Sequence, residues 1–203
     1  VEHKGEKQLY VTIGSGCRAH PLDQNTDEAF FVVRDDTVYK DEAPASMLTV
    51  DDLVNVGLGT PAKGDSPGWY YFLTTAPGEK VMSSPVVYDN TVYFSTYSPV
   101  GGSEEDSPCA VSLGSAYLHT VDLITGDPAR INSDGSVADT RQEKLRQQVP
   151  PPTPVLFMKD GKIKVVVGTE VPATGTPPDQ RLRKTQWRQL EPNEANVIPV
   201  DAK

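Results

Sequence analysis

Two stretches of this sequence repeat one order of features and decide its fold: SPVVYDNTVYFSTY at residues 84–97 and TPVLFMKDGKIKVVV at residues 153–167. Each contains a proline, an apolar run, a turn signal and a second apolar run. The turn signals are Asp89–Asn90 in the first stretch and Asp160–Gly161 in the second, and such pairs between apolar runs are typical of tight β-hairpins. The sequence therefore predicts two β-hairpins of the same kind.

The segment between the two hairpins predicts a further strand. AYLHTVDLITGDP, residues 116–128, reads as a strand that ends in a turn built on Asp122, Thr125 and Gly126. A hairpin, a third strand and this turn make up most of a four-stranded propeller blade. Because the hairpins recur without long helices, the pattern favours a β-propeller, built from radial repeats, over a β-sandwich.

Three more strands and one short helix are predicted in the first half of the chain. The strands are QLYVTIGSG (8–16), EAFFVVRDD (28–36) and GWYYFLTT (68–75). The helix is SMLTVDDLVNVG (46–57), because Thr49 and Asp52 fit a capping box and Gly57 supplies an end signal.

Loops are expected to decorate the strands. The acidic, Gly/Ser-rich stretch at 101–108 and residues 132–152 are the predicted insertions. The second insertion contains DTRQEKLRQQ (139–148), which predicts another short helix, ended by the prolines that begin at Pro150.

The length of the chain suggests part of a propeller. The 203 residues would supply about four blades of roughly 45–50 residues, the blade number of the smallest propellers. The chain begins inside a strand-like run and has only two good hairpin copies. We therefore expect an all-β fold in which residues 1–191 form a partial β-propeller and residues 192–203 a flexible or strand-completing tail. Because a partial ring leaves open sheet edges, we also expect a companion chain that carries the missing blades.

Composition and charge exclude some classes of function. The net charge is −9, and no block of basic residues occurs, so nucleic acid is not an expected partner. No apolar run approaches about 18 residues, so the chain is not expected to span a membrane. It opens without the apolar region of a signal peptide, which predicts either a cytosolic protein or the mature or truncated part of a longer one.

The sequence contains no recognisable catalytic motif. GxSxG, HExxH, Walker A and paired-cysteine metal spacings do not occur, and the chain has only three histidines. We therefore expect no catalytic residues, no enzyme activity and no resident cofactor. Cys17 and Cys109 lie far apart without CxxC spacing, and they form either one disulfide or two unrelated thiols.

The best candidates for a metal site are Asp23, Asn25 and Asp27, which alternate like positions one, three and five of an EF-hand loop. Position six is Glu28 rather than glycine, and position twelve is Arg34, where an acidic ligand is needed. We therefore expect an Asx turn here rather than a calcium site.

The stretch GSGCRAHPLD (14–23) is dense in residues that often carry function. Gly14 and Gly16 permit a tight turn or a close backbone approach. Arg18 could pair with a carboxylate where the chain doubles back, and His20–Pro21 fixes the direction in which the chain leaves. We interpret the motif as a structural corner of a blade rather than a catalytic site.

Trp69 and Tyr70 are the candidates for contact with a partner, because exposed aromatic side chains anchor interfaces. The alternative is that their strand packs between sheets.

The chain resembles the C-terminal region of the PilY/PilC family, large proteins associated with the tip and the biogenesis of type IV pili. Five elements occur in the family's order along nearly the whole chain. They are GSGCRAHPLD with EAFFVVRD (14–35), LTVDDLVNVG (48–57), the block from GWYYFLTT to FSTYSP (68–99), GSAYLHTVDLITGDP (114–128) and KTQWRQLEP (184–192). Cys17 stands where the family usually has tyrosine in the first element.

The resemblance implies a modified β-propeller that is exported through the periplasm and lies at the cell surface. In that oxidising setting it favours a Cys17–Cys109 disulfide. It also implies a non-enzymatic extracellular role in pilus biogenesis or adhesion, with minor pilins or the pilus tip as partners. Calcium binding would belong elsewhere in a full-length family member, because the family's calcium loop has no good copy here.

Two other functions are compatible with the sequence. One is a structural or decorating subunit of another extracellular filament. The other is a fragment of a quinoprotein dehydrogenase, because LHTVDLITGDP (118–128) also resembles the repeat of those propellers. That repeat ends in a tryptophan which this copy lacks.

Overall fold

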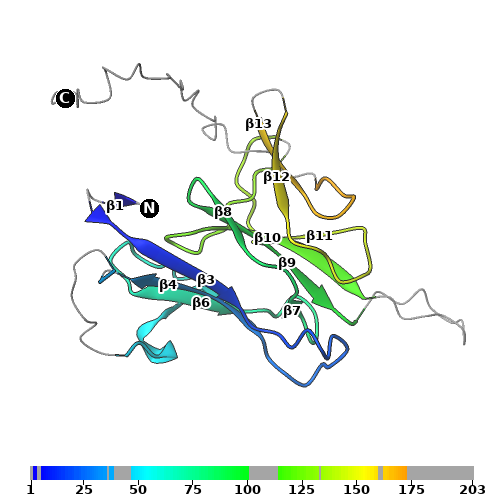
Figure 1. Cartoon of the computed structure of the whole chain (residues 1–203), viewed down its shortest axis with the longest axis horizontal. Helices are drawn as coiled ribbons and strands as arrows, with labels where there is room; N and C mark the ends of the chain where they lie inside the picture. The colour runs from blue at the N-terminus through cyan, green and yellow to red at the C-terminus, as the bar shows by residue number, and fades with distance from the viewer. Residues whose placement is uncertain are drawn as a thin grey trace, which may run out of the picture.

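The regular secondary structure in the described part of the chain consists almost entirely of β-strands (Figure 1). The computed structural model describes residues 2–3, 6–35, 37–38, 47–100, 114–132, 134–159 and 162–172. The all-β prediction is therefore confirmed for these residues. The predicted loop at 101–108 and the predicted tail at 192–203 lie outside them.

The first sheet has four strands in the order β3-β4-β6-β5. Its elements are β3 (Leu9–Gly14), β4 (Ala29–Asp35), β5 (Val54–Asn55) and β6 (Gly68–Phe72). The strand β4 pairs antiparallel with both β3 and β6, and β5 adds to β6 in parallel. Two shorter strands, β1 (Glu2–His3) and β2 (Glu6–Lys7), form a separate antiparallel pair.

The helix predicted over residues 46–57 was wrong. The described residues of this stretch form two 3₁₀ turns, η1 (Val50–Asp52) and η2 (Val56–Leu58), with β5 between them. The predicted capping box is present, since the Thr49 N–H donates to Oδ2 of Asp52 at 2.8 Å. Pairing of β5 with β6 replaces the helix, because it holds this segment in an extended conformation that suits β-branched valine.

The second sheet is built around two long central strands. Its elements are β7 (Lys80–Val81), β8 (Val86–Tyr88), β9 (Thr91–Ser98), β10 (Ser115–Asp122) and β11 (Gln142–Lys144). Both β7 and β8 pair with β9, and they share one of its edges. The predicted hairpin turn joins β8 to β9, with positive φ angles of 45° at Asp89 and 58° at Asn90. Two successive positive φ angles are the geometry of a type I′ turn.

The helix predicted over residues 139–148 was also wrong, because β11 forms an outer strand of the second sheet. Its residues pair antiparallel with Tyr117, Leu118 and His119 of β10. A helix of this length is marginal in isolation, whereas pairing along β10 gives the same backbone groups partners in a sheet.

The second predicted hairpin is present as β12 (Val155–Lys159) and β13 (Lys162–Val166). Its turn at Asp160–Gly161 lies outside the described residues. The two repeated stretches touch at equivalent positions, since the N–H of Ser84 lies 3.3 Å from Oγ1 of Thr153, and each residue precedes the proline of its own copy.

Apolar side chains cover both faces of the second sheet. Every residue of β9 is buried. One cluster joins this sheet to the first through residues such as Phe30, Trp69 and Phe94. The other cluster joins it to β12 and β13 through residues such as Leu118 and Val165. The hairpin of β12 and β13 is the third sheet of this stack. The first, second and third sheets therefore pack face to face in chain order, with the second sheet in the middle (Figure 1).

No helix in the described residues has the length and apolar character needed to cross a membrane.

Candidate functional site at the junction of the first two sheets

The two glycines of the GSGCRAHPLD motif bring the edge of the first sheet against β7. A Cβ atom on Gly14 would lie 2.3 Å from Cγ2 of Val81, and one on Gly16 would lie 2.9 Å from Cβ of Lys80. Between them, the carbonyl oxygen of Ser15 accepts a hydrogen bond from the Val81 N–H at 3.2 Å. Gly16 also has a φ of 145°, which side-chain-bearing residues rarely adopt. Glycine is required at both positions by the close approach of the two backbones.

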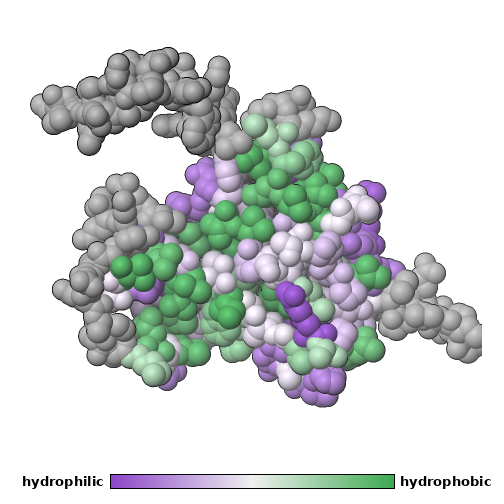
Figure 2. All heavy atoms as spheres, viewed as in Figure 1, coloured by the Kyte–Doolittle hydropathy of each residue, from purple (hydrophilic) through white to green (hydrophobic). Residues whose placement is uncertain are grey.

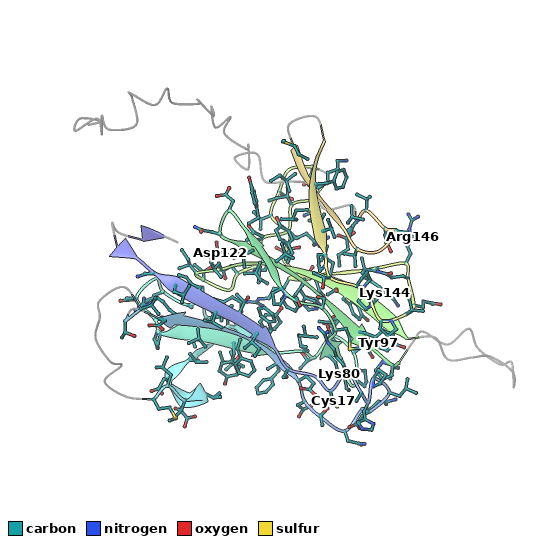
Figure 3. All side chains as sticks on the ribbon, viewed as in Figure 1. Cys17, Lys80, Tyr97, Asp122, Lys144 and Arg146 are labelled. Carbon is teal, nitrogen blue, oxygen red and sulfur yellow. The ribbon has the colours of Figure 1, made fainter. Side chains whose placement is uncertain are left out.

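Lys80 holds the loop that follows these glycines. Its side chain is buried, and its ammonium group donates to the carbonyl oxygens of Asp23 and Gly78. Figure 3 shows Lys80 beside the loop that carries Cys17. Within that loop, the His20 N–H donates a hydrogen bond to the carbonyl oxygen of Cys17 at 3.1 Å, and the Asp23 N–H donates to the carbonyl oxygen of His20 at 3.2 Å. The motif is therefore a folded corner that is fastened to the second sheet by Lys80 and by the backbone hydrogen bond between Val81 and Ser15.

The more polar residues of the motif lie outward. Arg18 and His20 are exposed, and Pro21 is half-buried. Arg18 forms no ion pair with any residue that the structure describes. The nearby carboxylate of Asp23 instead accepts hydrogen bonds from the backbone and side chain of Asn25, each at 3.0 Å.

These bonds are the Asx turn expected at the candidate calcium residues. The hydrogen bond from the Asn25 backbone lowers the pKa of the Asp23 carboxyl below its usual value. Asp27 is exposed, and the structure brings no group of three or more His, Cys, Asp or Glu together for a metal ion within the described residues. Cys17 is exposed and has no disulfide partner among the described residues, and Cys109 lies outside them.

Four polar side chains form a buried cluster between the two sheets: Tyr71 of β6, Glu79 just before β7, Thr96 of β9 and His119 of β10. Nδ1 of His119 lies 2.9 Å from the Tyr71 hydroxyl, and its Nε2 lies 2.9 Å from Oε1 of Glu79. Oγ1 of Thr96 donates to the same carboxylate oxygen at 2.6 Å. The N–H of Thr75 donates to the other carboxylate oxygen at 3.0 Å.

Burial and hydrogen bonding act in opposite directions on Glu79. Burial raises the pKa of this carboxyl, but the hydrogen bond and charge of His119, with the hydrogen bonds from Thr96 and Thr75, outweigh burial and hold the pKa below its usual value. Burial, together with the charge of Glu79, raises the pKa of the Tyr71 hydroxyl well above its usual value. The cluster is thus held as a neutral phenol beside an ionised carboxylate.

The cluster is enclosed by rings. Phe94 stacks on the imidazole of His119 with centroids 4.7 Å apart, and Phe30 stacks on Phe94 at 3.8 Å. Tyr71 is 5% exposed, and His119 and Glu79 are 1% exposed each. A hydroxyl, an imidazole and a carboxylate in a row can relay protons, but these three lie inside the core. Their arrangement fixes one sheet against the other.

The predicted turn after β10, residues 122–126, packs against the first sheet. Oδ1 of Asp122 accepts the N–H groups of Ile124 and Thr125 at 2.8 and 2.7 Å, and Gly126 has a φ of 72°. The indole N–H of Trp69 donates to the carbonyl oxygen of Leu123 at 3.0 Å. The turn is therefore both a local Asx turn and a contact between sheets.

Arg141 adds a second link at this turn. Its guanidinium donates to the carbonyl oxygens of Gly126 at 2.7 Å and Val56 at 3.0 Å, and it lies over the Tyr71 ring at 5.3 Å.

The two candidate partner-binding aromatics lie on opposite faces of the first sheet. Trp69 is only 1% exposed and belongs to the core, so it offers no surface to a partner. Tyr70 is half-buried and stacks with Phe31, at 5.7 Å between ring centroids, on the other face.

A separate polar groove of about 540 Å³ lies beside β11, lined by Glu143, Lys144 and Arg146 together with residues 169–172. Figure 3 shows Lys144 and Arg146 on this side of the second sheet. The carboxylate of Glu170 already has a protein partner in this groove, because it accepts a hydrogen bond from the backbone N–H of Arg146 at 2.8 Å. The groove mixes both signs of charge and selects no ligand class.

No protein-family model matches the chain, and comparisons with curated proteins and with solved structures give no match.

Sequence reasoning did not find the buried cluster. Its members come from four separate segments, so no local spacing connects them. The available signal was an ionisable side chain inside a largely apolar strand, as with His119 in AYLHTVDL, because a buried polar group needs partners from elsewhere in the fold.

Proposed function

We propose that this chain is a non-enzymatic extracellular interaction module of a type IV pilus tip or biogenesis protein, similar to the PilY/PilC family. In this proposal the three sheets are successive blades of a partial β-propeller. The observation that carries it is the face-to-face packing of the sheets in chain order, with the middle sheet covered on both faces. Radial repetition of such sheets is how a propeller is built.

The positions of the family-like motifs support the same proposal. GSGCRAHPLD forms the corner that fastens the first sheet to β7, and the turn Asp122–Gly126 contacts Trp69 of the first sheet through Leu123. Both motifs therefore act where one sheet meets the next. Residues that serve the joints between blades are expected to recur wherever the same ring is built.

The acidic cell-surface module would act by binding. Its partners in this proposal are minor pilins or the pilus tip, and its setting is the cell exterior after export through the periplasm. A Cys17–Cys109 disulfide belongs to the same proposal, and mass analysis of non-reduced peptides tests it directly.

Localisation in the source organism tests the function. An antibody raised against residues 1–203 should label the tips of type IV pili, and deletion of the coding region should reduce the number of surface pili until the gene is restored. Label spaced regularly along the sides of a filament would instead support a structural subunit. Dye reduction by the purified protein after addition of pyrroloquinoline quinone and calcium would contradict the non-enzymatic proposal.

A further inference from the structure

The outer face of the first sheet carries a continuous apolar surface. It is made by alternate residues of three neighbouring strands: Val11 and Ile13 of β3, Phe31 and Val33 of β4, and Tyr70 and Phe72 of β6. The strand registers place Ile13 beside Phe31 and Phe31 beside Tyr70, so the side chains form rows across the sheet. We refer to these six residues as the outer face.

The outer face is open to solvent at its margins. Ile13 is 57% exposed and Phe72 is 46% exposed. The ring of Phe72 packs edge-on against Tyr70, with centroids 5.6 Å apart. Figure 2 shows hydrophobic residues gathered over the part of the molecule where Figure 1 places β3, β4 and β6. Large contiguous apolar patches of this kind mark interaction sites in soluble proteins.

The sequence of β4 points to a sheet that is covered on both faces. Residues 29–33 read AFFVV, without the polar alternation that a strand with one solvated face would have. On the inner face, Phe30 and Val32 pack against the second sheet. The middle sheet of this chain shows the same two-sided apolar pattern, and a sheet does cover each of its faces.

We propose that a companion polypeptide packs the apolar face of an antiparallel β-sheet against the outer face. This inference rests on the proposed function in one respect, that the chain works as part of a larger assembly. The packing between the first and second sheets supplies the template. Branched aliphatic and aromatic side chains of both sheets share one buried cluster, in which Phe30 of the first sheet stacks on Phe94 of the second with ring centroids 3.8 Å apart.

Charge selects a companion over a second copy of this chain. Asp27 precedes β4 and Asp35 ends it, so acidic groups lie at both ends of the central strand. The whole chain carries a net charge of −9. A second copy would bring like charges together, whereas a sheet with basic residues around its apolar face would be complementary.

Site-specific photo-crosslinking in the source organism tests the inference. The photoreactive residue p-benzoylphenylalanine replaces Ile13 in one variant and Val137 in a control. Val137 lies in the segment after β10 and is 59% exposed, so the two positions are matched in exposure. We expect Ile13 to crosslink to one companion chain, at residues that alternate along a predicted strand and are flanked by Lys or Arg. We expect no such product from Val137.

A charge on the same surface provides the second measurement. Ile13→Lys should lower the amount of co-purifying companion at least about tenfold, because an unpaired charge between two apolar sheets is strongly disfavoured. Val137→Lys should leave it unchanged, and both variants should keep the wild-type circular dichroism spectrum, since neither side chain is in the core.

The outcomes separate this inference from the proposed function. A crosslink from Ile13 to another copy, to residues of the same polypeptide, or to no protein at all would overturn the inference, even if pilus assembly depends on the chain. A crosslink to a β-sheet of a companion that has no association with pili would support the inference while the pilus function fails.

Discussion

Glu79 links the two sheets through the buried cluster, and its removal should destabilise the fold strongly. Glu79→Ala would remove the carboxylate that accepts hydrogen bonds from the Thr96 hydroxyl and the Thr75 N–H and that lies 2.9 Å from Nε2 of His119. Thr96 and His119 are buried, whereas Thr75 is exposed. A buried polar group that loses its hydrogen-bond partner costs about 1–3 kcal/mol per group. Because domains of this size unfold with only about 5–15 kcal/mol, we expect the free energy of unfolding to fall by a large fraction.

Glu79→Gln is the matched control. It keeps an acceptor oxygen of similar size and loses the charge, so its cost should be smaller, about 1–3 kcal/mol, the value for a weakened hydrogen bond to a charged group. Urea unfolding followed by far-ultraviolet circular dichroism measures both variants. Trp69 fluorescence reports the junction itself when Trp187 is replaced by phenylalanine, since the Trp69 indole bonds to Leu123 across it.

The pH dependence of wild-type stability gives an independent check. The pKa of Glu79 is lowered in the folded state, so its contribution is complete above the unfolded-state pKa of about 4.3 and is lost as the pH falls through the folded-state pKa. Between these pH values the free energy of unfolding of the wild type should fall faster than that of Glu79→Gln.

The free energy of unfolding of Glu79→Ala gives the decisive result. A decrease of less than about 1 kcal/mol, which is below the cost of leaving a buried polar group without its partner, would show that Glu79 does not hold the two sheets together.

Three further predictions concern Gly14 at the edge of the first sheet, Asn90 in the hairpin turn and Tyr71 in the buried cluster. Gly14→Ala should lower the free energy of unfolding by about 1–3 kcal/mol through overpacking against Val81, and an unchanged urea midpoint would show that the edges do not meet as described. Asn90→Ala should lower the free energy of unfolding by about 1–2 kcal/mol, because alanine tolerates the left-handed conformation less well than asparagine does. Calorimetry measures this loss. Val87→Ala, a change on the exposed side of the same hairpin, is the control for effects of substitution that do not involve the turn. Tyr71 should stay un-ionised in the folded protein above the usual tyrosine pKa of about 10, so the free energy of unfolding should fall as the pH rises beyond that value. The phenolate absorbance of Tyr71, obtained as the difference between the wild type and Tyr71→Phe, should appear only when the protein unfolds.

Local sequence patterns predicted most of the strands. The apolar runs in EAFFVVRDD and GWYYFLTT became β4 and β6, and the Asp89–Asn90 pair formed the turn that joins β8 to β9. These features depend on residues that are close in sequence, so the sequence contains enough information to find them.

The predictions that failed depended on partners far away in sequence. Residues 46–57 carry helix start and end signals, and residues 139–148 are rich in residue types that favour helices, but pairing with β6 and β10 decides their conformation. The contact of Gly14 with Val81 and the burial of Trp69 similarly depend on how one sheet packs on another. The interpretation of GSGCRAHPLD as a corner anticipated a close approach at its glycines, and only the structure identifies β7 as the element approached.

We propose that this chain is one part of a stack of sheets that another polypeptide completes at the pilus. Native mass spectrometry of the complex released from sheared pili can detect that polypeptide. We expect a non-reduced species that contains this chain and one companion with predicted β-sheet structure. The companion should be lost in the Ile13→Lys variant. A species that contains this chain and no other polypeptide, or the absence of this chain from the sheared pili, would show that no companion completes the stack there.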